Sequence, residues 1–155
     1  MTTPIEKLRE LGYELPKPSP PVATYVPVTR TGSIVYISGQ ISRDDNGVVA
    51  GRLGDTMNVV QGGNAAELAA LGVLAQIVHG AGIELTAVKR VLKLTVFVCS
   101  TPEFAEHHLV ANGASNLIVH VLGDIGKHAR SAIGMIALPL GAAVEIDAIV
   151  AVKPD

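Results

Sequence analysis

Apolar residues recur along most of this chain, and their spacing changes from one segment to the next. Residues 56–81 predict a helix, and its core, residues 65–78, is apolar almost all round, so we expect it to be buried on more than one face. The β-branched runs 25–30 and 33–38 lie on either side of Thr31-Gly32 and predict a hairpin. Residues 88–98 predict a further strand, with residues 89, 91, 93, 95 and 97 on one face and residues 90, 92, 94 and 96 on the other.

The C-terminal half carries the strongest apolar segment, residues 128–150. We predict two strands there, paired as a hairpin about a tight turn at Leu138-Pro-Leu-Gly141. Ahead of them, the pattern predicts a helix over 103–110 that is interrupted at Asn112-Gly-Ala-Ser-Asn116. The apolar run 117–122 fits a helix or a strand, because periodicity does not separate the two over so short a stretch.

The first 21 residues differ in character from the rest of the chain. Thr3 and Glu6 have the spacing of a capping box, so we predict a short helix over residues 3–11. The proline-rich segment 15–21 is then expected to run extended along the surface. We therefore expect one domain, in which this helix and strap are appended to residues 22–155, and packing is the favoured role of the helix.

The order of elements is two strands, a short third strand, a helix, a strand, a helix and two strands. This order indicates an α+β fold of two layers, with the helices on one face of a mixed sheet. Hydrophobic residues make up 48% of the chain but aromatic residues only 3%, so small side chains must pack these layers closely. Charged residues make up 17%, which is low for a lone small domain and favours an oligomer with buried interfaces.

Charge and cysteine content argue against several classes of function. The net charge is −2 and no basic block occurs, so nucleic-acid binding has no electrostatic basis. A single cysteine, Cys99, rules out an internal disulfide and fits a reducing compartment. The N-terminus lacks the apolar core of a signal peptide and no apolar run reaches membrane-helix length, so we expect a cytoplasmic protein. The histidines show no metal-ligand spacing.

Two charges interrupt the C-terminal apolar segment, Arg130 at its start and Glu145 on its second strand. A charge in a buried strand needs an ion-pair or hydrogen-bonding partner, or a functional role. If the turn is centred near Leu140, Glu145 lies opposite about Ile136. It is then about 20 Å along the strand from Arg130, so the two could serve one small ligand only across neighbouring subunits. From the residues alone, Arg130 suits an interface salt bridge equally well, and Glu145 suits solvent or a lysine.

Several short motifs, in order along the chain, resemble the Rid/YjgF/L-PSP family over about residues 22–152. They are Tyr25, Ser38-Gly-Gln40, Ala129-Arg-Ser131, Leu138-Pro139 and Val144-Glu-Ile-Asp-Ala-Ile149. The N-terminal helix and the stretches 112–115 and 126–131 look like a longer branch of that family. The resemblance implies a chorismate-mutase-like fold, a homotrimer with three clefts between subunits, and no metal or organic cofactor.

The best understood members of that family hydrolyse reactive enamine or imine acids, such as 2-aminoacrylate, to 2-oxo acids and ammonia. The resemblance therefore implies this activity. Arg130 would bind the substrate carboxylate through two parallel hydrogen bonds, and the backbone N–H near Gly39 would add a donor. Glu145 would accept a proton from the attacking water. The other candidate substrate-binding residues are Tyr25, which would wall the cleft, Ser38, Ala132 and His128.

The chain departs from the family pattern at three positions. Ala132 stands where active members commonly carry a cysteine, Pro102 aligns roughly with a frequent asparagine, and Gly134 replaces a frequent glutamate. His128 lies two residues before Arg130, so it could reach the same cleft. The alternatives are a non-catalytic trimer that binds small carboxylate metabolites and the endoribonuclease or translation-inhibitor activity given to other members. The acidic balance argues against the latter.

Overall fold

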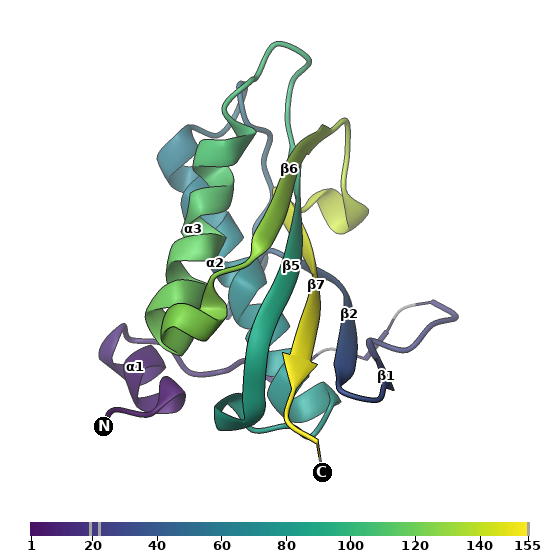
Figure 1. Ribbon diagram of the computed structural model, residues 1–155. Coiled ribbons are helices and arrows are strands. Elements are labelled where there is room, and N and C mark those ends of the chain that lie inside the picture. Colours follow the sequence, from purple (N-terminus) through teal and green to yellow (C-terminus); the bar gives the residue numbers. More distant parts are fainter. Residues whose placement is uncertain (19, 22, 155) are drawn as a thin grey trace.

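The computed structural model describes residues 1–18, 20–21 and 23–154. The strands of its main sheet are β1 (Val28–Thr31), β2 (Ile34–Ile41), β5 (Val88–Cys99), β6 (Ala129–Met135) and β7 (Val144–Val152). The helices are α1 (Pro4–Glu10), α2 (Val59–Ala75) and α3 (His107–Leu122). The sheet has the order β1-β2-β7-β5-β6, and α2 and α3 lie side by side on one of its faces (Figure 1).

The sheet is mixed, since β5 and β6 run parallel while the other neighbouring strands run antiparallel. The α+β prediction, with helices on one face of a mixed sheet, is therefore confirmed. The predicted N-terminal hairpin is present as β1 and β2, although β1 begins later than expected. A small second sheet pairs β3 (Arg43–Asp44) with β4 (Gly47–Val48) across a turn.

The predicted C-terminal hairpin is wrong, because β5 lies between β6 and β7. Arg130 on β6 lies opposite Leu94 of β5, and the two strands are parallel. Glu145 on β7 lies opposite Phe97, not opposite Ile136. The physical reason is the crossover through α3, because a helix that joins two strands of one sheet lays them parallel. The chain after β6 must then pass the end of β5 before β7 begins.

The predicted break at residues 112–116 is also wrong, because α3 runs through it without interruption. Gly113 is needed for close packing rather than for a turn. A Cβ built there would lie 2.7 Å from the carbonyl carbon of Gly63 in α2, well inside ordinary contact distance. Residues 117–122 are therefore helical, and α3 begins at His107 instead of residue 103.

The helix predicted over 56–81 is present as α2, which begins at Val59, and the π-helical turn Gln76–Gly80 that comes after it. Asn58 caps α2, since its side chain accepts the Gln61 N–H while the Gln61 side chain accepts the Asn58 N–H. Between these helices and the sheet lies the core, which small residues of α2 and β-branched residues of the strands fill. Within the described residues, no helix combines the length and apolar character needed to cross a bilayer.

The N-terminal helix is confirmed, including its capping box between Thr3 and Glu6. It is more than an appendage, because Leu8 is only 1% exposed and belongs to the main core. The described residues of the segment 15–21 have no helix or strand, as its prolines predict. Residues 19 and 22 lie outside the described part of the chain.

Candidate functional site

Arg130 lies on β6, at the edge of the sheet, and its side chain points to the helix face. Its Nη1 donates to Asn112 Oδ1 at 3.0 Å and to Ser115 Oγ at 3.1 Å. Its Nη2 donates to the His108 carbonyl oxygen at 3.1 Å. All three acceptors belong to α3, so one helix fixes the plane of the guanidinium. Among the described residues no carboxylate contacts it, and two of the five guanidinium N–H groups carry no hydrogen bond.

His128 joins this network from the segment just before β6. Its Nδ1 lies 2.6 Å from the Gly126 carbonyl oxygen, and its Nε2 lies 2.9 Å from Ser115 Oγ. A carbonyl only accepts, so Nδ1 carries the proton and Nε2 of the neutral ring accepts from the Ser115 hydroxyl. Burial lowers the pKa of His128, and the positive charge of Arg130 lowers it further against the opposing effect of the Gly126 carbonyl. His128 and Arg130 thus share the Ser115 hydroxyl as a hydrogen-bonding partner.

Glu145 lies on the other face of the sheet, beside Phe97, and is half-buried. Its carboxylate lies over Gly39, where an added Cβ would be 2.8 Å from the Glu145 Cδ. Gly39 thus makes room for this carboxylate where β2 bulges between Ile37 and Gln40. Burial raises the pKa of Glu145, and the negative charge of Asp147 raises it further.

Ser38 lies next to this carboxylate site, and its Oγ is buried without a hydrogen-bond partner among the described residues. Ser38 and Gly39 line a hollow of about 430 Å³ on the outer face of the sheet, together with Thr29, Tyr36, Lys93, Thr95, Asp147 and neighbouring apolar residues. Tyr25 precedes β1 and is 48% exposed, and it is not part of that lining. Glu145 is not part of the lining either, although its carboxylate lies over Gly39. The buried Ser38 hydroxyl, without a partner in the described part of the chain, marks this hollow as a place for a polar ligand or water.

Apart from Tyr25, the predicted residues therefore form two groups that do not meet within one chain. Arg130 faces the helices, as Leu94 beside it does, whereas Glu145 and Phe97 face the opposite side of the sheet. Three positions along the strands and two strand spacings across them separate the two residues, or about 14 Å. The distance expected between Arg130 and Glu145 from a hairpin was wrong. The two side chains are nevertheless far apart within one chain, and they also face opposite sides of the sheet.

Two of the three departures from the family pattern, Ala132 and Gly134, lie on the helix side of β6, whereas Pro102 lies in the turn between β5 and α3. Ala132 is partly buried and packs against the core. Beyond it, a Cβ at Gly134 would lie 2.6 Å from His107 Nε2 and 2.7 Å from Ser100 Oγ. These two atoms are 3.1 Å apart, so an imidazole and a hydroxyl fill the space where the resemblance leads us to expect a glutamate side chain.

Sequence reasoning missed Asn112 and Ser115, which hold Arg130. Their signal was present, since they are polar residues three positions apart, the spacing of one helix face. Cys99 is buried, as expected for a small core residue. Within the described residues, no three His, Cys, Asp or Glu side chains gather as a metal site would require.

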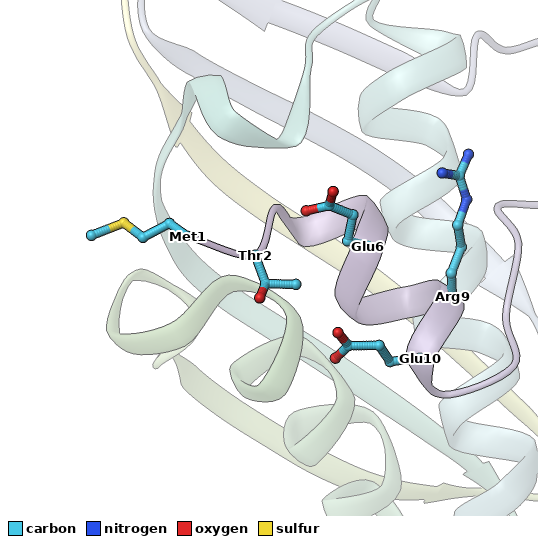
Figure 2. A pocket seen from close by; sticks show the side chains of 5 residues that line it. All are labelled: Met1, Thr2, Glu6, Arg9 and Glu10. Atoms are coloured by element: carbon cyan, nitrogen blue, oxygen red, sulfur yellow. The ribbon is translucent and has the colours of Figure 1, made fainter.

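A second hollow, of about 590 Å³, lies beside α1 (Figure 2). It is lined by Met1, Thr2, Glu6, Arg9 and Glu10, all of them exposed. The Glu6 carboxylate already accepts the Thr3 N–H as part of the helix cap. Charges of both signs stand in solvent here, so this hollow lacks the enclosed polar group that marks the other one.

The strand order and the two helices on one face define an α+β domain. Polar sites lie on both faces of its sheet, and one of them contains the arginine of the edge strand. The chain belongs to the endoribonuclease L-PSP family, whose model matches residues 17–152. The resemblance carried by the short motifs is therefore confirmed.

Individual relatives extend this match to nearly the whole chain. The chain is 46% identical to protein TCP17 of Trypanosoma cruzi over 145 residues, which are 92% of this chain and 90% of that protein. The crystal structure of Atu1372 from Agrobacterium tumefaciens, a protein of unknown function, has a TM-score of 0.90 and 46% identity, covering 97% of this chain and 92% of its own. RidA from an Antarctic Psychrobacter species has a TM-score of 0.60 and 27% identity, covering 88% and 94%.

Proposed function

We propose that this protein hydrolyses small imine or enamine acids to 2-oxo acids and ammonia, in clefts between the subunits of a homotrimer. The observation that carries the proposal is the guanidinium of Arg130, which α3 fixes through three hydrogen bonds. The two N–H groups that remain are as many as a carboxylate accepts in a bidentate pair. A charged group held this way, without a carboxylate in contact among the described residues, supports a role as the anchor for an acidic substrate.

The chemistry asks little more of the protein than a placed water and one mobile proton. A protonated imine carbon is electrophilic, so water adds to it while a base accepts a proton from the water. The same group then returns the proton to the nitrogen. As the C–N bond breaks and ammonia leaves, the base accepts the hydroxyl proton, and the 2-oxo acid remains. Glu145 suits this exchange, because its raised pKa lies closer to neutrality than that of an ordinary carboxyl group.

A shared site is supported by the geometry of the single chain. Arg130 and Glu145 face opposite sides of the sheet, so one small ligand would meet both only if a neighbouring subunit supplied one of them. Apolar residues are exposed at and beyond the β6 edge: Ile133, Met135, Ile136 and Leu140. Covering such a patch is a usual reason for a chain to assemble.

A second candidate is a non-catalytic trimer that binds small carboxylate metabolites through Arg130. Ala132 favours it, because the methyl group brings no functional atom to the position where active relatives commonly carry a thiol. The two candidates share the anchor and differ in turnover alone.

The test uses 2-iminobutanoate, generated in place from 2-aminobutanoate by an amino-acid oxidase, with semicarbazide as a competing trap. The wild-type protein should clear the imine, and Arg130→Ala should lower kcat/KM about a hundred-fold, since it removes a charged hydrogen-bonding partner. Arg130→Lys should fall between them, because an ammonium lacks the planar fork. Arg9→Ala, at an exposed arginine of α1, is the matched control.

The outcomes separate the candidates. If Arg130→Ala clears the imine as fast as wild type, the assignment to this site is wrong. If wild type clears nothing but binds 2-oxobutanoate, and Arg130→Ala does not, the carboxylate binder is the better description. Sedimentation should give a trimer, and a monomer would contradict the shared cleft.

A further inference from the structure

Two segments that lie apart in the sequence meet at the Ser115 hydroxyl. The Asn112–Ser115 turn of α3 and the His128–Arg130 segment around the start of β6 share three hydrogen bonds: Arg130 to Asn112, Arg130 to Ser115, and Ser115 to His128. Both segments were among those that set this chain apart from the shorter family pattern. The proposed chemistry uses Arg130 from this group and leaves the serine and the histidine unexplained.

The hydrogen bonds have one consistent direction. His128 Nδ1–H donates to the Gly126 carbonyl, which leaves the Nε2 lone pair as an acceptor. The Ser115 hydroxyl donates its hydrogen to that lone pair, so its own lone pairs are free for the Arg130 Nη1–H. The neutral imidazole thus orients the Ser115 hydroxyl, and that hydroxyl is one of the three acceptors that hold the guanidinium.

We propose that Ser115 and His128 are positioning residues for Arg130, and that the neutral form of His128 is the one that keeps the guanidinium in place. The inference rests on the proposed function in one respect, namely that Arg130 binds a carboxylate. Neither residue needs to touch the substrate. Their effect is to keep the two free N–H groups of Arg130 oriented, so that less conformational entropy is lost when the ligand binds.

Protonation of His128 should undo this arrangement. Both ring nitrogens then donate, so Ser115 Oγ would have to accept from two cations at once, and the imidazolium and guanidinium would repel each other across it. The groups around the ring do not offset this charge. α3 presents the uncharged Ser115, the preceding turn presents the Gly126 carbonyl, and β6 presents Arg130.

The ion pair that includes the residue before His128 does not change this balance. The neighbouring Lys127 ammonium lies 2.7 Å from the carboxylate of Asp124 and is paired with it. Carboxylate affinity should therefore be full while His128 is neutral and should fall as the pH drops through its pKa.

The test measures 2-oxobutanoate affinity by calorimetry at about pH 7.5 and about pH 4.5, the lower value being chosen because burial and Arg130 hold the pKa of His128 below that of an ordinary histidine. Ser115→Ala should weaken binding about three- to ten-fold at the higher pH, since one hydrogen bond to a charged group is lost. His128→Gln, which keeps an acceptor but cannot become charged, should bind nearly as well as wild type at the higher pH and lose less affinity on acidification. His120→Gln, an exposed histidine of α3, is the matched control.

Nitrogen NMR of the histidine rings gives a readout that does not depend on ligand or turnover. In wild type the His128 ring should be the Nδ1–H tautomer, and Arg130→Gln should raise its pKa because a nearby positive charge is removed. The signal is assigned by its loss in His128→Gln. A pKa that is unchanged in Arg130→Gln would overturn the proposed coupling.

The two proposals fail in different ways. If Arg130→Ala loses binding while Ser115→Ala and His128→Gln match wild type at both pH values, the positioning role is wrong and the anchor stands. If the affinities and NMR signals match the expected pattern but no imine is cleared, the hydrolase proposal fails and the positioning role stands. If wild type does not bind 2-oxobutanoate at all, the carboxylate anchor is wrong, and the NMR result alone decides whether the three residues are coupled.

Discussion

At Gly113, α3 lies directly against the backbone of α2. A Cβ built on this residue would be 2.7 Å from the carbonyl carbon of Gly63 and 2.9 Å from its Cα, whereas ordinary contacts of this kind begin near 3.4 Å. The opposing atoms belong to a helix backbone, so they cannot rotate away as the end of a side chain can. Gly113→Ala must therefore push the two helices apart.

The expected cost is set by two opposing effects. Alanine is favoured over glycine inside a helix by up to about 1 kcal/mol. Overpacking a core costs typically about 1–3 kcal/mol, and the rigid partner puts this contact at the upper end or beyond it. Gly113→Ala should therefore lower the free energy of unfolding by about 2 kcal/mol. For a chain of this length that corresponds to a fall in Tm of about 4–8 °C.

Gly63→Ala is the matched control, because it changes the other glycine of the same contact. A Cβ built on Gly63 meets nothing within 4 Å, so this substitution should keep the helix-propensity gain and stabilise the protein by up to about 1 kcal/mol. Urea unfolding of the three proteins at one concentration measures both effects. If Gly113→Ala proves neutral or stabilising, the helices are not packed backbone to backbone, and the reasoning about α3 is refuted.

Burial and charge support two further predictions. Leu8→Ala should lower the free energy of unfolding by about 2–5 kcal/mol, because Leu8 is 1% exposed. Leu11→Ala is the control, since this residue is 44% exposed and the change should be at most about 0.5 kcal/mol. If both substitutions change the free energy of unfolding by equally small amounts, α1 lies outside the core. Glu145→Gln should stabilise the protein near neutral pH. The folded-state pKa of Glu145 is raised, so the stability it contributes at low pH is lost as pH rises through that pKa, and the gap should close below the ordinary value of 4.5. A gap independent of pH in urea unfolding would reject this account.

The elements could be predicted from the sequence wherever local chemistry decides them. Thr3 and Glu6 specify the start of α1, and Thr31-Gly32 specifies the first hairpin. The pairing of the last two strands could not be predicted in this way. Their apolar runs and the turn near Leu138 fit a hairpin, but β5 takes the place between them because α3 returns the chain to the same sheet. Which strands are neighbours in a sheet depends on the whole topology, so a short segment of sequence cannot predict it.

Gly113 shows the same limit for a single residue. In the sequence, a glycine in a stretch that contains asparagine and serine has the signature of a helix break. In the fold it permits close approach to Gly63, and the helix continues through it. The two roles need the same residue type, so composition alone cannot separate them. What decides is a second helix more than forty positions away.

Some residues of the candidate site could likewise be predicted from the sequence, and others could not. Arg130 and Glu145 could be singled out from the sequence because a charge in an apolar strand needs a reason. Their opposite faces could not be predicted while the strand order was unknown. Ser115 was hidden for a third reason: a serine is informative only once the helix that carries it is known to face β6. Ser115 contacts both Arg130 and His128, so the segment that resembled a helix interruption in fact supports the candidate anchor. A search for catalytic groups in this chain should therefore begin from the partners of Arg130 and work outward, since residues that hold a charge in place are the ones that the sequence pattern conceals.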